Sequence, residues 1–153
     1  GQLEAGLKTA SVQDPEVYAP ALRASLARAF CLLGRSDEAE QILIGLEEII
    51  GDLPVPRKTQ VQIHMAAVWL SMGQKEDARA MLRSAWRVCS VRGFQVWGLR
   101  CLMLMAEAVE PGDAAQVRRD ARKLADQLLD NLPSELIHYF RRQPGRARLW
   151  SGR

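Results

Sequence analysis

Apolar residues recur along the chain at intervals of three and four positions, and short polar stretches interrupt them at regular places. This spacing gathers the apolar side chains on one face of an α-helix, whereas a β-strand alternates every second residue. The pattern predicts helices at residues 17–33, 37–50, 61–72, 78–89, 94–109 and 113–129. The sequence therefore predicts an all-α fold.

Glycine and proline residues mark where the predicted helices end. Gly34, Gly73 and Gly93 each follow an apolar stretch, and a residue without a Cβ atom suits the C-terminus of a helix. Pro54 and Pro56 lie between the second and third helices, and a proline has no N–H to donate within a helix. Residues 53–56 are therefore predicted to form a connector.

Two segments with the same residue pattern lie 39 positions apart. Residues 33–39 read Leu-Gly-Arg-Ser-Asp-Glu-Ala and residues 72–78 read Met-Gly-Gln-Lys-Glu-Asp-Ala, so both run glycine, two polar residues, two acids and alanine. The same offset leads from Gly73 to Gly112. An internal period of this length indicates stacked units that bury their apolar faces against one another. We expect three helical hairpins, at residues 17–52, 57–93 and 94–131.

Small and aromatic residues occupy fixed positions around the first two of these glycines. An alanine and an aromatic residue precede each glycine and a second alanine follows it, giving the sets Ala27, Phe30, Gly34, Ala39 and Ala66, Trp69, Gly73, Ala78. This pattern resembles the tetratricopeptide repeat, in which small residues let paired helices approach and the aromatic ring fills the gap between them. The resemblance implies a short right-handed solenoid of helical hairpins.

The third hairpin departs from this pattern, because Val117 stands in place of the alanine and Ala108 in place of the aromatic residue. The period is also longer than the usual ~34 residues. In this respect the chain resembles the long-repeat variants found in large bacterial signalling proteins, such as kinases, ATPases and transcriptional regulators. The resemblance implies a regulatory scaffold domain within a larger bacterial protein.

The resemblance also implies that the first helix of each hairpin lines a concave groove. The residues that this arrangement assigns to the groove are Ala24, Arg28, Ile63, His64, Ala67, Leu70, Leu99, Leu102, Met103 and Ala106. Most of them are apolar, which suits a partner's amphipathic helix, whereas the family's clamp for a C-terminal carboxylate needs Lys, Arg and Asn. Alternatively, these residues are core, covered by further repeats or by the C-terminal helix of this chain.

The net charge of +3 is unevenly distributed. Residues 1–56 contain four basic and nine acidic residues, whereas residues 57–109 contain eight basic and three acidic residues. Nucleic-acid binding normally needs a sustained basic face, so it is disfavoured, and contact through the basic second and third hairpins is a weaker alternative.

A row of arginines is predicted on the second helix of the second hairpin. Arg79, Arg83 and Arg87 recur every four residues and so share one helix face, with Arg92 just beyond them. Such a face could meet an acidic partner, including the acidic first hairpin of a second copy in a homodimer. Alternatively, it is a solvated outer surface.

The two ends of the chain lie outside the predicted hairpins. Residues 1–16 are expected to be a lead-in, residues 133–142 a capping helix, and residues 143–153 a flexible basic tail. Because the chain opens at Gly1 without a methionine, we expect it to be a piece of a larger protein.

Little in the sequence indicates catalysis. His64 and His138 lie far apart, no group has the spacing of metal ligands, and no motif for a nucleophile or a phosphate loop occurs, so no catalytic residue, metal or cofactor is expected. The three cysteines, Cys31, Cys89 and Cys101, lie in apolar stretches and are interpreted as small core residues. No apolar run is long enough to span a membrane and no signal peptide is evident, which favours the cytoplasm and argues against a membrane partner.

Together these observations predict a protein–protein interaction module that holds a partner helix in an apolar groove. The expected partner is another protein or another domain of the parent protein. Homo-oligomerisation is the first alternative.

Overall fold

The computed structural model describes residues 19–134. Its helices are α2 (Ala19–Leu32), α3 (Ser36–Ile50), α4 (Val55–Ser71), α5 (Lys75–Arg92), α6 (Gln95–Ala108) and α7 (Pro111–Asp130). These six helices correspond one for one to the predicted helices, and no strand occurs within residues 19–134. The predicted all-α fold is confirmed for this part of the chain.

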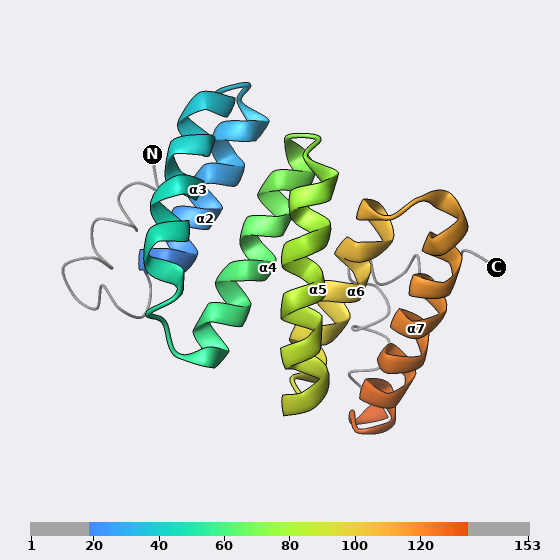
Figure 1. Ribbon diagram of the computed structural model, residues 1–153. Helices are drawn as coiled ribbons and strands as arrows, with labels where there is room; N and C mark the ends of the chain where they lie inside the picture. The colour runs from blue at the N-terminus through green and yellow to red at the C-terminus, as the bar shows by residue number, and fades with distance from the viewer. Residues whose placement is uncertain (1–18, 135–153) are drawn as a thin grey trace.

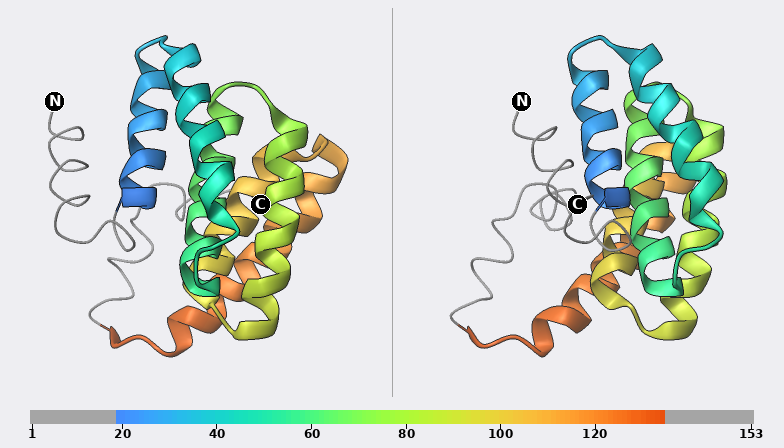
Figure 2. Two further views of the ribbon diagram at one scale, coloured as in Figure 1. Left: turned by 60° about the vertical axis from the view of Figure 1, so that its left-hand side comes forward. Right: turned by 90° about the vertical axis from the view of Figure 1, so that its left-hand side faces the viewer.

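The helices form three successive hairpins, α2–α3, α4–α5 and α6–α7, whose members pack side by side (Figure 1). The first helices of the hairpins also pack on one another, α2 against α4 and α4 against α6. Figure 2 shows this first layer beside a second layer that contains α3 and α5. The core therefore lies between two layers of helices.

Alanines hold the centre of this core. Ala27, Ala39, Ala66 and Ala78 are fully buried, and the aromatic rings of Phe30 and Trp69 lie among them in the same cluster. A methyl side chain lets two helices approach closely, and a large ring nearby then fills the remaining space.

The α2–α3 and α4–α5 turns have the same backbone structure. Gly34 and Gly73 both adopt a left-handed conformation, with φ of +76° and +77°. The next residue donates its N–H to the carbonyl of the aromatic residue, from Arg35 to Phe30 at 2.8 Å and from Gln74 to Trp69 at 2.9 Å. This is the Schellman arrangement, so corresponding side chains leave the two turns from equivalent backbone positions.

The α6–α7 turn is built differently. Gly112 lies inside α7 without a positive φ, and Val109 instead ends α6 in an extended conformation. The prediction that Gly112 repeats the turn glycines is wrong, because Pro111 has a φ suited to a first helical turn and so starts α7 two residues earlier than predicted.

Prolines also lie at the start of α4, before and within its first turn. Val55 and Pro56 belong to its first turn and Pro54 precedes them as the capping residue. The predicted connector at residues 53–56 is thus two residues too long, because a first-turn N–H has no helical partner and a proline there loses nothing. Gly93, with φ of +71°, ends α5 as predicted.

Three predicted segments are not assessed by this structure. The lead-in at residues 1–16, all but the start of the capping helix at 133–142, and the tail at 143–153 lie outside the described residues. Among the helices that are described, none is both long and apolar enough to cross a membrane.

Candidate functional site

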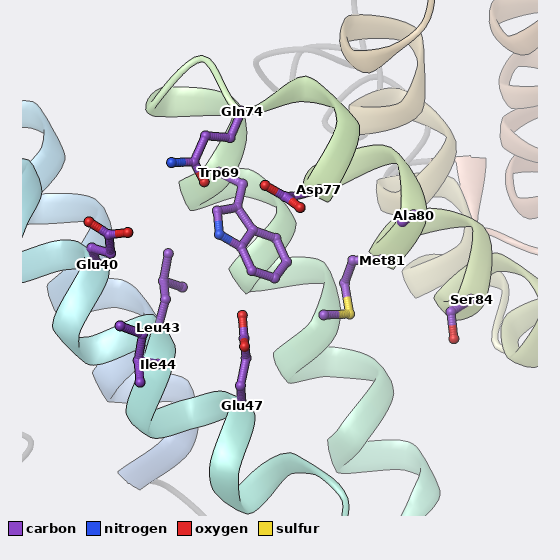
Figure 3. A pocket seen from close by; sticks show the side chains of 10 residues that line it. All are labelled: Glu40, Leu43, Ile44, Glu47, Trp69, Gln74, Asp77, Ala80, Met81 and Ser84. Atoms are coloured by element: carbon purple, nitrogen blue, oxygen red, sulfur yellow. The ribbon is translucent and has the colours of Figure 1, made fainter.

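The three hairpins do not pack on one another in the same way. Helix α5 lies along α6 as closely as helices within a hairpin do, whereas α3 touches α4 at few places and makes at most marginal contact with α5. The first hairpin is joined to the second mainly through α2 and α4. A cleft of about 480 Å³ therefore lies between α3 and α5 (Figure 3).

The floor of this α3/α5 cleft is apolar. Leu43 and Ile44 come from α3, Trp69 from α4 and Met81 from α5. Leu43 is buried in the core, but Ile44 is 45% exposed. An apolar residue of a ligand would therefore find an apolar surface that already faces solvent.

The rim of the cleft is acidic. Glu40 and Glu47 lie seven residues apart on α3 and so project from one face, and Asp77 lies in the first turn of α5. All three are exposed, and none forms an ion pair with any residue in the range 19–134. Their combined field favours a cation in the cleft.

Trp69 lies between the two walls. Only 8% of it is exposed, and its indole N–H donates no hydrogen bond to the described residues. Figure 3 shows the indole nitrogen on the side of the ring that faces α3 and the six-membered ring facing Met81. Because no buried side-chain nitrogen among the described residues lacks a partner, this N–H reaches solvent and is an accessible donor in the cleft.

The predicted concave groove is largely filled. Ala24, Ile63, Ala67, Leu99 and Leu102 are all buried, and Leu102 is only 4% exposed. Burial of these five residues is what the alternative interpretation of them as core requires. Arg28 is exposed, and the partly exposed members are His64, Leu70, Met103 and Ala106. Partner binding by these accessible residues stays a prediction.

The accessible part of that groove is cationic. His64 packs edge-on against Trp97, with ring centroids 5.8 Å apart. Burial, and then the charges of Arg100 and Arg28, lower the pKa of His64 below its usual value. The structure thus brings predicted residues from α2 and α4 close to Arg100 of α6, which the sequence analysis did not select.

The predicted arginine row is split by the structure. The partly buried Arg79 guanidinium donates from Nη2 and Nε to the Ala108 carbonyl, at 2.8 and 3.2 Å. Arg83, Arg87 and Arg92 are exposed. Arg79 therefore joins α5 to the end of α6, and only the other three can meet a partner.

Comparisons of the chain with protein-family models, with curated proteins and with solved structures find no match. Function is therefore inferred from the geometry of the chain itself.

The α3/α5 cleft was not predicted from the sequence. A signal was present, because Glu40 and Glu47 are seven residues apart on a predicted outer helix. A second signal was the exchange of Arg35 for Gln74 between otherwise similar turns. What the sequence pattern does not contain is the separation of α3 from α5, which depends on how whole hairpins stack.

The cysteines have the environment of structural residues. The Cys101 thiol is fully buried and donates to the Leu82 carbonyl at 3.1 Å, and burial, with a smaller effect of Cys89, raises its pKa to about 12. Burial also raises the pKa values of Cys31 and Cys89. These thiols stay protonated near neutral pH, and a protonated thiol is a poor nucleophile.

Proposed function

We propose that this chain is a protein-interaction domain, built from tetratricopeptide-like hairpins, that binds a peptide segment of a partner protein in the α3/α5 cleft. The observation that carries the proposal is the cleft itself, whose apolar floor contains a largely buried indole with an N–H that has no acceptor within residues 19–134. Its volume of about 480 Å³ is in the range of ligand-binding pockets.

The tetratricopeptide-like reading is supported by two features that recur 39 residues apart. One is the Schellman turn at Gly34 and Gly73, and the other is the burial of alanines at equivalent positions. Packing of α2, α4 and α6 in one layer is what a right-handed solenoid of three hairpins requires. As in the larger regulatory proteins that the repeat resembles, the partner segment can belong to another domain of the same polypeptide.

The cleft provides three kinds of contact for an extended peptide. An apolar side chain would bury surface against Ile44 and Met81. A backbone carbonyl would accept the indole N–H of Trp69 in place of water. The acidic rim would draw in cationic side chains and would set the direction of the peptide.

Homo-oligomerisation is a second candidate, and one observation favours it. Arg83, Arg87 and Arg92 are exposed on α5, while the cleft of the same chain is rimmed by carboxylates. The arginines of one copy could then meet the cleft of another. Light scattering over a concentration series distinguishes the two candidates, because only self-association makes the mass rise with concentration.

A peptide-display selection on the folded chain tests the proposed function. We expect enriched peptides that bind the wild type and lose binding to an Ile44→Asp variant, which places a charge on the apolar floor. Val91→Asp is the matched control, because Val91 is 87% exposed and does not line the cleft. Failure to enrich any peptide, or equal loss in both variants, would contradict the proposal.

A further inference from the structure

The first hairpin contains a complete arginine site within its own turn. The Arg35 guanidinium lies 4.4 Å from the centroid of the Phe30 ring and donates to both carboxylate oxygens of Glu38, at 2.6 and 2.5 Å. The cation thus combines contact with an aromatic face and a bidentate ion pair.

The second hairpin has the corresponding aromatic ring and carboxylate but not the cation. A shift of 39 residues carries Phe30 to Trp69 and Glu38 to Asp77, which keeps the aromatic ring and the carboxylate. The same shift carries Arg35 to Gln74, which has no charge. Because both turns have the same Schellman backbone, these positions are equivalent in space as well as in sequence.

The change leaves the second ring and its acid without an internal cation. Figure 3 shows Gln74 and Asp77 beside the Trp69 indole at the edge of the α3/α5 cleft. Asp77 forms no ion pair among the described residues, and Glu40 and Glu47 add two carboxylates on the opposite wall. Tryptophan is also the strongest of the aromatic side chains in contacts with a cation.

We propose that the α3/α5 cleft binds the guanidinium group of an arginine in an extended segment of a partner protein. This inference rests on the proposed function and specifies the partner's chemistry. The guanidinium pairs with Asp77 and lies against the part of the Trp69 indole that faces the cleft, at the positions that correspond to Glu38 and Phe30 around Arg35 in the first hairpin.

Two features select an arginine in a peptide over other cations. A planar guanidinium donates two parallel hydrogen bonds to one carboxylate and stacks on an aromatic ring, whereas a lysine ammonium does neither. The exposed Ile44 floor and the Trp69 N–H then provide surface and a donor for the residues beside the arginine, which a free cation would leave unused.

Heteronuclear NMR of the indole N–H groups tests the proposal directly. The probe is N-acetyl-arginine N-methylamide, and the same derivative of lysine is the comparison. We expect the Trp69 signal, assigned with a Trp69→Phe variant, to shift and saturate with the arginine probe. The lysine probe should bind about tenfold more weakly, because it lacks the stacking and the bidentate pair.

The decisive variant is Gln74→Arg, which restores in the second hairpin the residue that the first already has. We expect the Trp69 signal of this variant to be shifted without any probe and to respond at least about tenfold more weakly to the arginine probe. Asp77→Asn should weaken binding without that initial shift. Arg83→Gln, on the same helix but outside the cleft, should bind the probe as the wild type does.

Three results would overturn the proposal. The first two are equal binding of the arginine and lysine probes, and unchanged binding of the arginine probe by Gln74→Arg. The third is a wild-type dimer that Gln74→Arg dissociates, because the occupant of the cleft would then be a second copy of this chain. If display selection yields peptides that need Ile44 but the arginine probe does not bind, the arginine site fails while the interaction function stands. If neither peptide nor probe binds, the proposed function itself fails.

Discussion

Arg79 on α5 caps the C-terminus of α6 by donating from Nη2 and Nε to the Ala108 carbonyl oxygen, at 2.8 and 3.2 Å. The last carbonyls of a helix have no partner within the helix and carry partial negative charge, so a cation there satisfies both the hydrogen bond and the dipole. The second and third hairpins are thereby linked by a polar contact in addition to apolar packing.

Arg79→Ala should lower the free energy of unfolding by about 1–2 kcal/mol, because a partly buried, charge-assisted hydrogen bond is lost. Urea denaturation measures the change. Arg83→Ala is the matched control, one turn along the same helix and exposed, and it should change stability by less than ~0.5 kcal/mol. Equal effects of the two substitutions would show that the Arg79 contact does not contribute.

The turn glycines should respond differently to alanine. Gly73→Ala places a Cβ atom on a left-handed residue and should cost about 1–2 kcal/mol, although no atom lies within 4 Å of that position. Gly112→Ala lies inside α7 and should leave stability unchanged or slightly raised. Thermal unfolding monitored by circular dichroism compares the stability of the two variants. A loss of stability in Gly112→Ala equal to that in Gly73→Ala would show that the α6–α7 turn does use a glycine.

Two helical glycines differ in the space around them. A Cβ atom on Gly98 would lie 3.1 Å from the Trp86 ring, whereas one on Gly45 would meet nothing within 4 Å. Gly45→Ala should therefore raise the free energy of unfolding by roughly 0.5–1 kcal/mol through helix propensity alone. The free energy of unfolding of Gly98→Ala should be at least ~1 kcal/mol lower than that of Gly45→Ala, because the Trp86 ring must move to make room for the new Cβ atom. Identical effects in chemical denaturation would refute the close approach.

Alkaline pH should destabilise the fold through Cys101. Burial raises the pKa of this thiol from 9.0 to about 12, so the folded state holds the proton more tightly than the unfolded chain does. Its contribution is fully present below pH 9.0 and is lost progressively as the pH rises towards 12.

At about pH 10.5 the wild type should therefore have lost about 2 kcal/mol more than a Cys101→Ala variant, each relative to its own stability near pH 8. Urea denaturation at the two pH values measures this difference. Parallel pH profiles for the two proteins would show that Cys101 does not retain its proton in the folded state.

The sequence predicted the helices well because their ends carry local signals. Gly34, Gly73 and Gly93 stop helices by their own backbone conformation, and this requires no knowledge of distant residues. The third turn was misassigned because Pro111 starts a helix before Gly112 can end a turn. Local chemistry therefore determined both the successes and the error.

The site was harder to predict because it depends on packing between hairpins. For Leu102 the sequence left an open groove and the core as alternatives, and in the structure it packs beside Leu99 and Ala121. An aspartate at Leu102 would therefore test folding more than binding. The α3/α5 cleft exists because α3 stands away from α5, and no pattern within either helix specifies that distance.

The identical backbone of the first two turns gives the residue after the turn glycine an unusual position in this chain. At that point the first hairpin has an arginine, which contacts its own aromatic ring and acid, and the second hairpin has an uncharged glutamine. The choice is independent of the core, because the alanines that pack the helices lie elsewhere in the repeat. Hairpins of this type could therefore gain or lose a binding site during evolution, or by design, without being refolded around it.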